Sequence, residues 1–193
     1  MFMRTYIIAL LAISILSGCV EDDMTKMSVE MFNQDGDSLG TIELIEEADG
    51  LGLTIHLEGL PPGEHGLHIH EKGVCKGPDF IRAGDHLNPD ENKHGLLHPE
   101  GAHAGDLPNI IADDDGIVDA KLKAPKLTLK KGVKNSLLKQ DGTAIIITEN
   151  KDDGMTQPAG DSGERIACGE ITEDEAKRQD KKEVPSEEKN ASS

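Results

Sequence analysis

Short runs of alternating apolar and polar residues recur along most of the chain, from residue 28 to residue 171. A period of two, bounded by Asp-Gly, Pro and Gly, is typical of β-strands joined by tight turns. The expected strands, about eight, lie in the runs SVEMFN, TIELIE, LTIHLEG, HGLHIHE, IVDAKLKA, SLLKQ, AIIITEN and RIACGEI. No long stretch keeps helical periodicity. The pattern therefore predicts an all-β fold, an eight-stranded Greek-key β-sandwich or flattened barrel.

Two long segments interrupt this pattern. Residues 72–112 form a stretch of about forty residues without a convincing strand, and residues 151–164 form a shorter one. Loops of such length inside a compact domain are uncommon and usually functional. Something must order them, and a bound metal is the obvious candidate. We interpret them as a long metal-binding loop and a second active-site loop.

The first eighteen residues are typical of an export signal. Arg4 supplies a positive start, and residues 6–16 (YIIALLAISIL) form an apolar core too short to span a bilayer. The following run Leu-Ser-Gly-Cys ends at Cys19 and resembles a bacterial lipobox, in which the cysteine is lipidated. The alternative is a plain secretory signal with an incidental cysteine. A lipidated Cys19 would anchor an extracytoplasmic protein to the membrane through acyl groups alone.

The chain divides into a signal peptide (1–18), a tether from Cys19 (19–27), one domain (28–172) and a charged tail (173–193). The tail holds almost no large apolar residues, so we expect it to be disordered. A solvated terminal helix is the alternative.

The net charge of the chain is −17, and removal of Arg4 with the signal gives −18. A charge of this size argues against nucleic acid and against adhesion to anionic lipid headgroups. With Cys19 assigned to lipid, Cys75 and Cys168 remain. In an oxidising compartment such a pair is most simply a disulfide.

All eight histidines lie between positions 56 and 103. His68 and His70 alternate on an expected strand, so both imidazoles project from one face of the sheet. The long loop carries three further imidazoles and a carboxylate: His86, His94, His103 and Asp106. Taken singly, each is best interpreted as an ordinary polar loop residue. As a set, three imidazoles and one carboxylate suit tetrahedral zinc.

These segments resemble copper/zinc superoxide dismutases of the bacterial lipoprotein type. The resemblance covers approximately residues 28–172. It rests on five motifs, HGLHIHEKGVC (65–75), AGDHLNP (83–89), KHG (93–95), HAGDLPN (103–109) and GDSGERIACG (160–169). It implies a Greek-key β fold with copper and zinc as cofactors and superoxide as substrate.

The resemblance also implies residue roles. His68, His70 and His86 would bind copper, and His86 would bridge to zinc, which His94, His103 and Asp106 complete. Asp152 would link ligand histidines of the two metals, and Cys75 and Cys168 would form the disulfide. Arg165 would orient superoxide, while His86 and solvent would deliver protons. His65 matches a structural histidine.

One departure affects the copper site. The family places a fourth copper histidine where this chain has Thr148, and no histidine follows His103. A hydroxyl is a poor copper ligand beside imidazole. The expected copper site is therefore incomplete, unless His98 or a partner chain supplies the missing nitrogen. The acids Asp161 and Glu164, close to Arg165 in sequence, also weaken attraction of an anionic substrate.

Two functions remain open. One is a superoxide dismutase-like enzyme that converts superoxide to oxygen and hydrogen peroxide, with activity impaired by loss of the fourth copper histidine. The other is a non-enzymatic, zinc-stabilised lipoprotein that binds or buffers copper. A third, an interaction module, rests only on the acidic tail. Whether the protein is a monomer or a homodimer is undetermined by the sequence.

Overall fold

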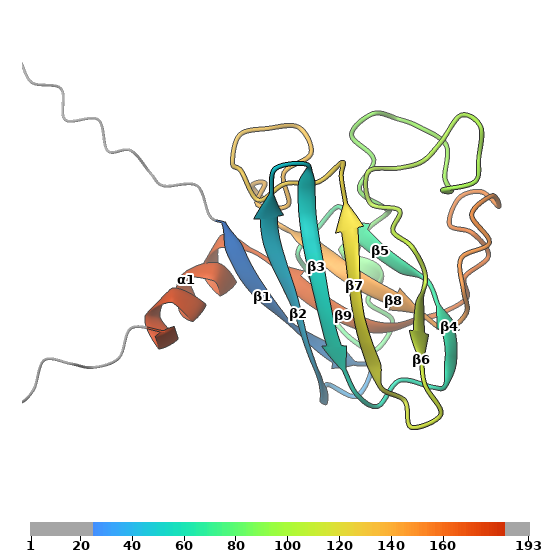
Figure 1. Ribbon diagram of the computed structural model, residues 1–193, viewed down its shortest axis with the longest axis horizontal. Coiled ribbons are helices and arrows are strands. Elements are labelled where there is room, and N and C mark those ends of the chain that lie inside the picture. The colour runs from blue at the N-terminus through green and yellow to red at the C-terminus, as the bar shows by residue number, and fades with distance from the viewer. Residues whose placement is uncertain (1–24, 184–193) are drawn as a thin grey trace, which may run out of the picture.

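The computed structural model describes residues 25–183, and within this range it contains nine strands and one α-helix (Figure 1). The strands are β1 (Lys26–Asn33), β2 (Ser38–Glu47), β3 (Gly50–Leu57), β4 (Gly63–His65), β5 (Leu67–His70), β6 (Ile110–Ala112), β7 (Val118–Ala124), β8 (Thr143–Thr148) and β9 (Arg165–Ile171). A 3-10 turn, η1 (Ile81–Ala83), and the helix α1 (Glu173–Glu183) complete the elements.

Seven strands form one antiparallel sheet in the order β5-β8-β9-β1-β2-β3-β7. The alternation seen in the sequence sets its faces. Ile42 and Leu44 of β2 pair with Ile55 and Leu53 of β3, and all four side chains are buried. Between them, Glu43 pairs with Thr54 on the other face. The core is aliphatic, built mainly from Leu and Ile, with Ala next in number.

A two-stranded antiparallel sheet of β4 and β6 joins the two ends of the large sheet. β4 is separated from edge strand β5 by Gly66 alone, and β6 lies against the opposite edge strand β7 (Figure 1). The sheet therefore curls into a flattened barrel, and the predicted all-β fold class is confirmed.

Three details of the strand prediction are wrong. SLLKQ is not a strand, because its Leu137 and Leu138 fill the core from a loop. Ile110–Ala112, expected to be loop, forms β6. HGLHIHE is divided at Gly66, where a Cβ would lie 2.5 Å from Thr148 Oγ1. The second loop agrees with the expectation, since residues 151–164 contain no strand or helix.

The domain boundaries also shift slightly. β1 begins at Lys26, inside the expected tether, because Met27 is buried in the core. Residues 173–183, expected to be disordered, form α1 instead. Its Ala176 is buried, and Thr172 Oγ1 accepts a hydrogen bond from Glu175 N at its start. The acids of its first turn also favour the helix.

The signal peptide, Cys19 and residues 184–193 lie outside the described residues. Within residues 25–183, no helix is both long and apolar enough to cross a membrane.

Candidate metal centre

Strand β5 holds the centre together by pairing on both of its edges. One edge pairs with β8, where His68 lies opposite Ile146. The other edge receives the long loop: Ile69 N donates to Gly105 O, and Ile69 O accepts from Leu87 N, at 2.9 and 2.7 Å. These bonds set His70 opposite His86 and His68 opposite Asp106. The loop is therefore fixed by backbone hydrogen bonds at the two places where its candidate ligands lie.

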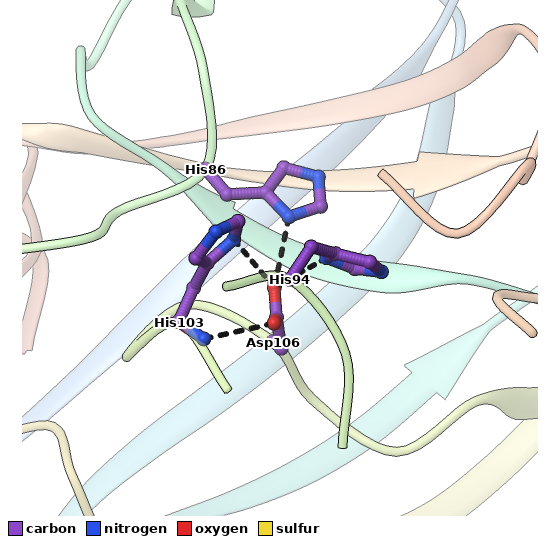
Figure 2. Close-up of side chains that lie close together, drawn as sticks. All are labelled: His86, His94, His103 and Asp106. Atoms are coloured by element: carbon purple, nitrogen blue, oxygen red, sulfur yellow. Dashed lines mark hydrogen bonds and ion pairs between the residues drawn. The ribbon is translucent and has the colours of Figure 1, made fainter. Parts of the chain in front are cut away.

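Four predicted zinc residues converge on one point. The Nδ1 atoms of His86, His94 and His103 lie 2.9, 3.1 and 3.2 Å from the same oxygen, Asp106 Oδ1 (Figure 2). His103 Nδ1 is buried and, apart from this contact with Asp106, has no polar partner among the described residues. Three nitrogens and one carboxylate oxygen in such proximity form a group that could hold a metal ion.

The second oxygen of Asp106 fixes the orientation of this carboxylate. Asp106 Oδ2 accepts hydrogen bonds from Gly95 N at 2.8 Å and His103 N at 2.9 Å. Burial opposes ionisation, but hydrogen bonds from His103, His86 and Gly95 hold the pKa of Asp106 far below its usual range. The carboxylate is therefore ionised, and Oδ1 faces the imidazoles.

A second group, His68, His70 and His86, adjoins the first through the shared His86. The rings of His68 and His86 stack with centroids 4.1 Å apart, and those of His70 and His86 are 4.9 Å apart. His68 Nδ1 and His70 Nε2 are buried without hydrogen-bond partners. Buried polar atoms are normally paired, so these two fit the roles of metal ligands.

Burial keeps His70 and His86 neutral, as metal ligands must be. Burial lowers the pKa of His86 to about 4, with Asp106 opposing and His68 lowering it further. The pKa of His70 is also well below its ordinary value, first because of burial and then because of His86. Both rings are thus unprotonated near neutral pH.

Asp152, from the second loop, connects the two groups. Its Oδ2 lies 2.8 Å from His68 Nε2, and its Oδ1 lies 3.1 Å from His94 Nε2. Gly154 N donates a third hydrogen bond to this carboxylate. Burial raises the pKa of Asp152, but the bonds from His68, Gly154 and His94 lower it by more. Each linked histidine is left with Nδ1 for a metal.

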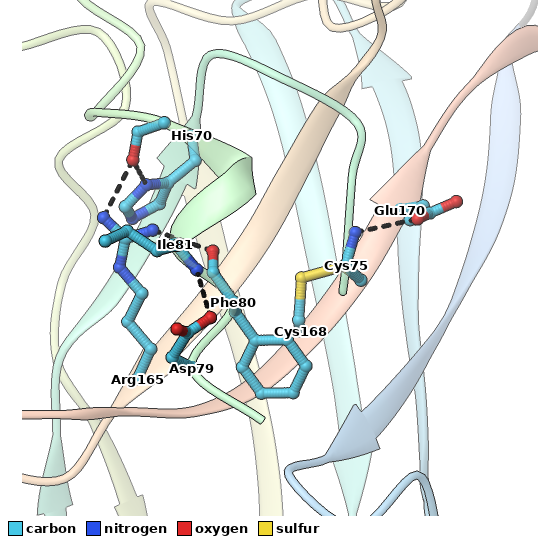
Figure 3. The surroundings of a disulfide bond; sticks show 9 residues. His70, Cys75, Asp79, Phe80, Ile81, Arg165, Cys168 and Glu170 are labelled. Atoms are coloured by element: carbon cyan, nitrogen blue, oxygen red, sulfur yellow. Dashed lines mark hydrogen bonds between the residues drawn. A yellow bond between two sulfur atoms is a disulfide. The ribbon is translucent and has the colours of Figure 1, made fainter. Parts of the chain in front are cut away.

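Arg165, on β9, is held beside the second group by the disulfide segment. Its guanidinium donates to Phe80 O and Gly84 O at 2.9 and 2.8 Å. Gly84 O also accepts from His70 Nδ1 at 2.9 Å, so one carbonyl positions both side chains (Figure 3). Phe80 packs with Cys75 and Cys168, which form the expected disulfide. The crosslink thereby anchors the segment that holds Arg165.

Thr148 lies where the resemblance placed a copper ligand. A Cβ at Gly66 would be 2.5 Å from Thr148 Oγ1 and 2.9 Å from His68 Cε1, so both atoms lie close to one point. The hydroxyl lies 3.1 Å from Asn150 O and 3.4 Å from Gly66 O, to which it can donate. The hydrogen-bond partners of this hydroxyl are therefore backbone carbonyls.

A cavity of about 550 Å³ opens beside this second group. Its walls come from both loops and from β5, β8 and β9: His70, Glu71, Asp85, His86, Asn88, His103, Thr148, Pro158, Ala159, Ser162, Gly163 and Arg165. A small anion entering it would meet Arg165 and the imidazole of His70 together.

Three histidines, His56, His65 and His98, lie outside both groups. His56 is exposed and its Nδ1 contacts Asp119 Oδ1. His98 belongs to neither metal-compatible group and does not line the cavity. Its Nδ1 accepts a hydrogen bond from Glu100 N. His65 has its two ring nitrogens 2.9 Å from Thr148 O and 2.7 Å from Pro61 O, contacts expected of a structural residue.

Sequence reasoning missed three contributors to the site. Gly84 acts through its backbone carbonyl, and Gly95 through its N–H, so neither has a side-chain signal. Asp85 lines the cavity and directly precedes His86. Its position in the sequence alone does not identify it as part of the site, because the cavity is visible only in the structure.

Comparison with known proteins agrees with this geometry. The family model of copper/zinc superoxide dismutase (SODC) matches residues 38–171. Superoxide dismutase [Cu-Zn] 2 of Aquifex aeolicus is 48% identical over 158 residues, which is 81% of this chain and 92% of that protein. A superoxide dismutase-like protein of Bacillus subtilis is 48% identical over 146 residues, 74% of each chain.

A solved structure is also similar. The crystal structure of a double mutant of a SOD-like protein from Bacillus subtilis matches with a TM-score of 0.74 at 48% identity. The match covers 75% of this chain and 96% of that one. The family implies copper and zinc as metals, in agreement with two adjoining histidine groups. The chain belongs to the copper/zinc superoxide dismutase family.

Proposed function

We propose that this protein is a superoxide dismutase-like metalloprotein with a complete zinc site and a copper site of three histidines. Zinc would be held by His86, His94, His103 and Asp106, and copper by His68, His70 and His86. The buried nitrogens His68 Nδ1 and His70 Nε2, which have no hydrogen-bond partner, are the observation that supports copper there.

The reaction would convert two superoxide anions and two protons to oxygen and hydrogen peroxide. Copper supplies the electron acceptor and donor for this redox change. Arg165 would attract the anion and orient it at the mouth of the second group, since its guanidinium lines the cavity. His86 would pass a proton through its ring, and solvent in the cavity would supply the second.

Thr148 is the reason to expect weakened activity. A threonine hydroxyl that donates to backbone carbonyls offers copper little in place of an imidazole. With three histidine ligands, copper would be bound more loosely and its redox potential would change. We therefore expect dismutation slower than that of a four-histidine site.

The second candidate function is copper binding or buffering without turnover. It is favoured by the same observation, because His68, His70 and His86 can bind copper even where the fourth ligand is absent. The SOD-like name of the Bacillus subtilis relative is compatible with either function.

Substitution at position 148 separates the two. The wild type, Thr148→His and Thr148→Val would be loaded with copper and zinc, analysed for metal, and assayed by pulse radiolysis. We expect slow dismutation by the wild type and by Thr148→Val, the control that removes only the hydroxyl. Thr148→His should tighten copper binding by roughly 10-fold or more, a gain comparable with that from an outer hydrogen-bond partner, and accelerate dismutation.

The outcomes discriminate clearly. Dismutation found only in Thr148→His would replace the enzyme proposal with copper binding. Fast dismutation by the wild type, unchanged by Thr148→His, would show that the ligand argument is wrong. Electron paramagnetic resonance of the Cu(II) form should count three nitrogen ligands in the wild type and four in Thr148→His.

We propose further that the protein acts outside the cytoplasm as a lipoprotein anchored at Cys19. The Cys75–Cys168 disulfide supports an oxidising compartment. Metabolic labelling with a fatty-acid analogue should mark the wild type and not Cys19→Ala. Labelling of neither would favour a plain secretory signal.

A further inference from the structure

The mouth of the cavity carries an unusual balance of charge for a site that would receive an anion. Of the residues lining it, Arg165 is the only lysine or arginine, whereas Glu71 and Asp85 are both acids. The second loop, residues 151–164, supplies Asp153, Asp161 and Glu164, and its one lysine, Lys151, pairs with Glu64 at 3.1 Å.

The two acids at the mouth are not equivalent. Glu71 Oε1 lies 3.3 Å from Lys72 Nζ, so its charge is largely compensated. Asp85 is exposed and, among the described residues, has no ion-pair partner within 4.0 Å. It is near enough to Arg165 to act on the charge of the guanidinium. Asp85 therefore offsets the positive potential that Arg165 gives the cavity.

The position of Asp85 is set by the backbone rather than by its carboxylate. Asp85 O accepts a hydrogen bond from Glu71 N at 2.9 Å, within the ladder that joins the long loop to β5. This pairing leaves the Asp85 side chain free at the rim, directly before His86 in sequence. Its carboxylate is thus available to a solute entering the cavity.

The chemistry of His70 indicates which kind of solute this carboxylate would attract into the cavity. His70 lines the same cavity, is 2% exposed, and its buried Nε2 has no hydrogen-bond partner. A cation that passes the carboxylate of Asp85 would next meet a neutral imidazole nitrogen, which is a good ligand for copper. An acid at the rim and a free imidazole behind it form an entry path for a metal cation.

We propose that Asp85 offsets the charge of Arg165 at the mouth of this cavity, so that copper enters faster and small anions bind more weakly than they would without it. The inference rests on the proposed copper site but not on turnover. An unpaired carboxylate beside the path contributes a local field that salt screens. Removing it should slow copper entry and strengthen anion binding together.

The test uses the zinc-loaded wild type, Asp85→Asn and the matched control Asp114→Asn. Asp114 is exposed in the turn before β7, does not line the cavity, and its substitution changes the net charge by the same amount. Aqueous Cu(II) would be mixed with each protein in a stopped-flow instrument, and loading followed by the visible absorption of the copper site. Azide affinity would then be titrated on the copper-loaded forms.

At low ionic strength, Asp85→Asn should load copper about tenfold more slowly than the wild type, as expected when a divalent cation loses the attraction of one charge about 6 Å from its path in water. It should also bind azide about threefold more tightly. Both differences should vanish at high ionic strength, and Asp114→Asn should match the wild type.

Equal loading rates and equal azide affinities in the wild type and Asp85→Asn would overturn this inference while leaving the copper site intact. Equal changes in Asp85→Asn and Asp114→Asn would overturn it too, because the effect would then be that of net charge. Failure of the wild type to dismutate superoxide would instead overturn the enzyme proposal alone.

Discussion

Asp106 allows the structural and the metal-binding contributions of one carboxylate to be separated. Its Oδ2 accepts two backbone hydrogen bonds, from Gly95 and His103, while Oδ1 faces three imidazoles. Asp106→Asn can keep a carbonyl oxygen toward the two N–H groups, but it removes the charge that zinc requires. Asp106→Ala removes both.

The expected magnitude follows from these contacts. Hydrogen bonds to a charged group contribute about 1.5–3 kcal/mol each, so Asp106→Ala should lower the metal-free stability by at least about 3 kcal/mol. For a domain of this size that corresponds to roughly 6–12 °C in Tm. Asp106→Asn should lose less, because an amide oxygen can still accept both bonds.

Zinc adds a second, distinct difference. At a free concentration about 1,000 times its Kd, a ligand stabilises the native state by about 4 kcal/mol. Differential scanning calorimetry with and without zinc should show this gain in the wild type and in neither variant. A Tm of metal-free Asp106→Ala equal to that of the wild type would refute the hydrogen-bond argument. A full zinc response in Asp106→Asn would refute the ligand assignment.

Three further predictions concern the rest of the domain. The double variant Cys75→Ser/Cys168→Ser should lose about 4–5 kcal/mol in urea unfolding, because the disulfide spans a sequence separation of 93 residues in the unfolded chain; a loss under about 1 kcal/mol would contradict the chain-entropy estimate. Gly95→Ala should lower the free energy of unfolding by about 1–2 kcal/mol because of the φ of +109°, and by a further 1–3 kcal/mol because the new Cβ would overlap Gly154 O. In the control Gly132→Ala, no atom lies within 4 Å of the new Cβ, so only the backbone penalty should be measured. The metal-free protein should lose stability as pH falls from about 6.5 toward 4, because His86, with its folded pKa lowered to about 4, binds a proton more readily when unfolded; urea midpoints that stay constant across this range would show that burial of His86 does not govern acid stability.

The strands and the ligand set were largely predictable because both depend on side-chain identity. Alternation located β2, and a short apolar run next to a turn located β8. The loop histidines with Asp106 were recognisable as one zinc-compatible set. The arrangement that brings them together was not predictable. It depends on backbone bonds between Ile69, Gly105 and Leu87, and a backbone donor or acceptor leaves no trace in residue identity.

Weak local signals account for the remaining differences. The charged composition after residue 172 predicted disorder, yet the helix α1 forms there. Its local support is one buried side chain, Ala176, and a hydrogen bond to Thr172 Oγ1 at its start. Leu137 and Leu138 matched a strand but fill the core from a loop, since burial alone does not specify hydrogen-bond pairing.

The shared carbonyl of Gly84 has a consequence for how this site tolerates sequence change. Because a peptide oxygen accepts from both His70 and Arg165, no side-chain replacement at residue 84 can remove the acceptor itself. Gly84 has a φ of +79°, and a Cβ there would crowd the Glu71 side chain, so this position itself resists substitution. Mutations elsewhere can disturb the pair only by moving the backbone. As the surrounding sequence diverges, the positions of the His70 and Arg165 side chains should therefore change together rather than one at a time.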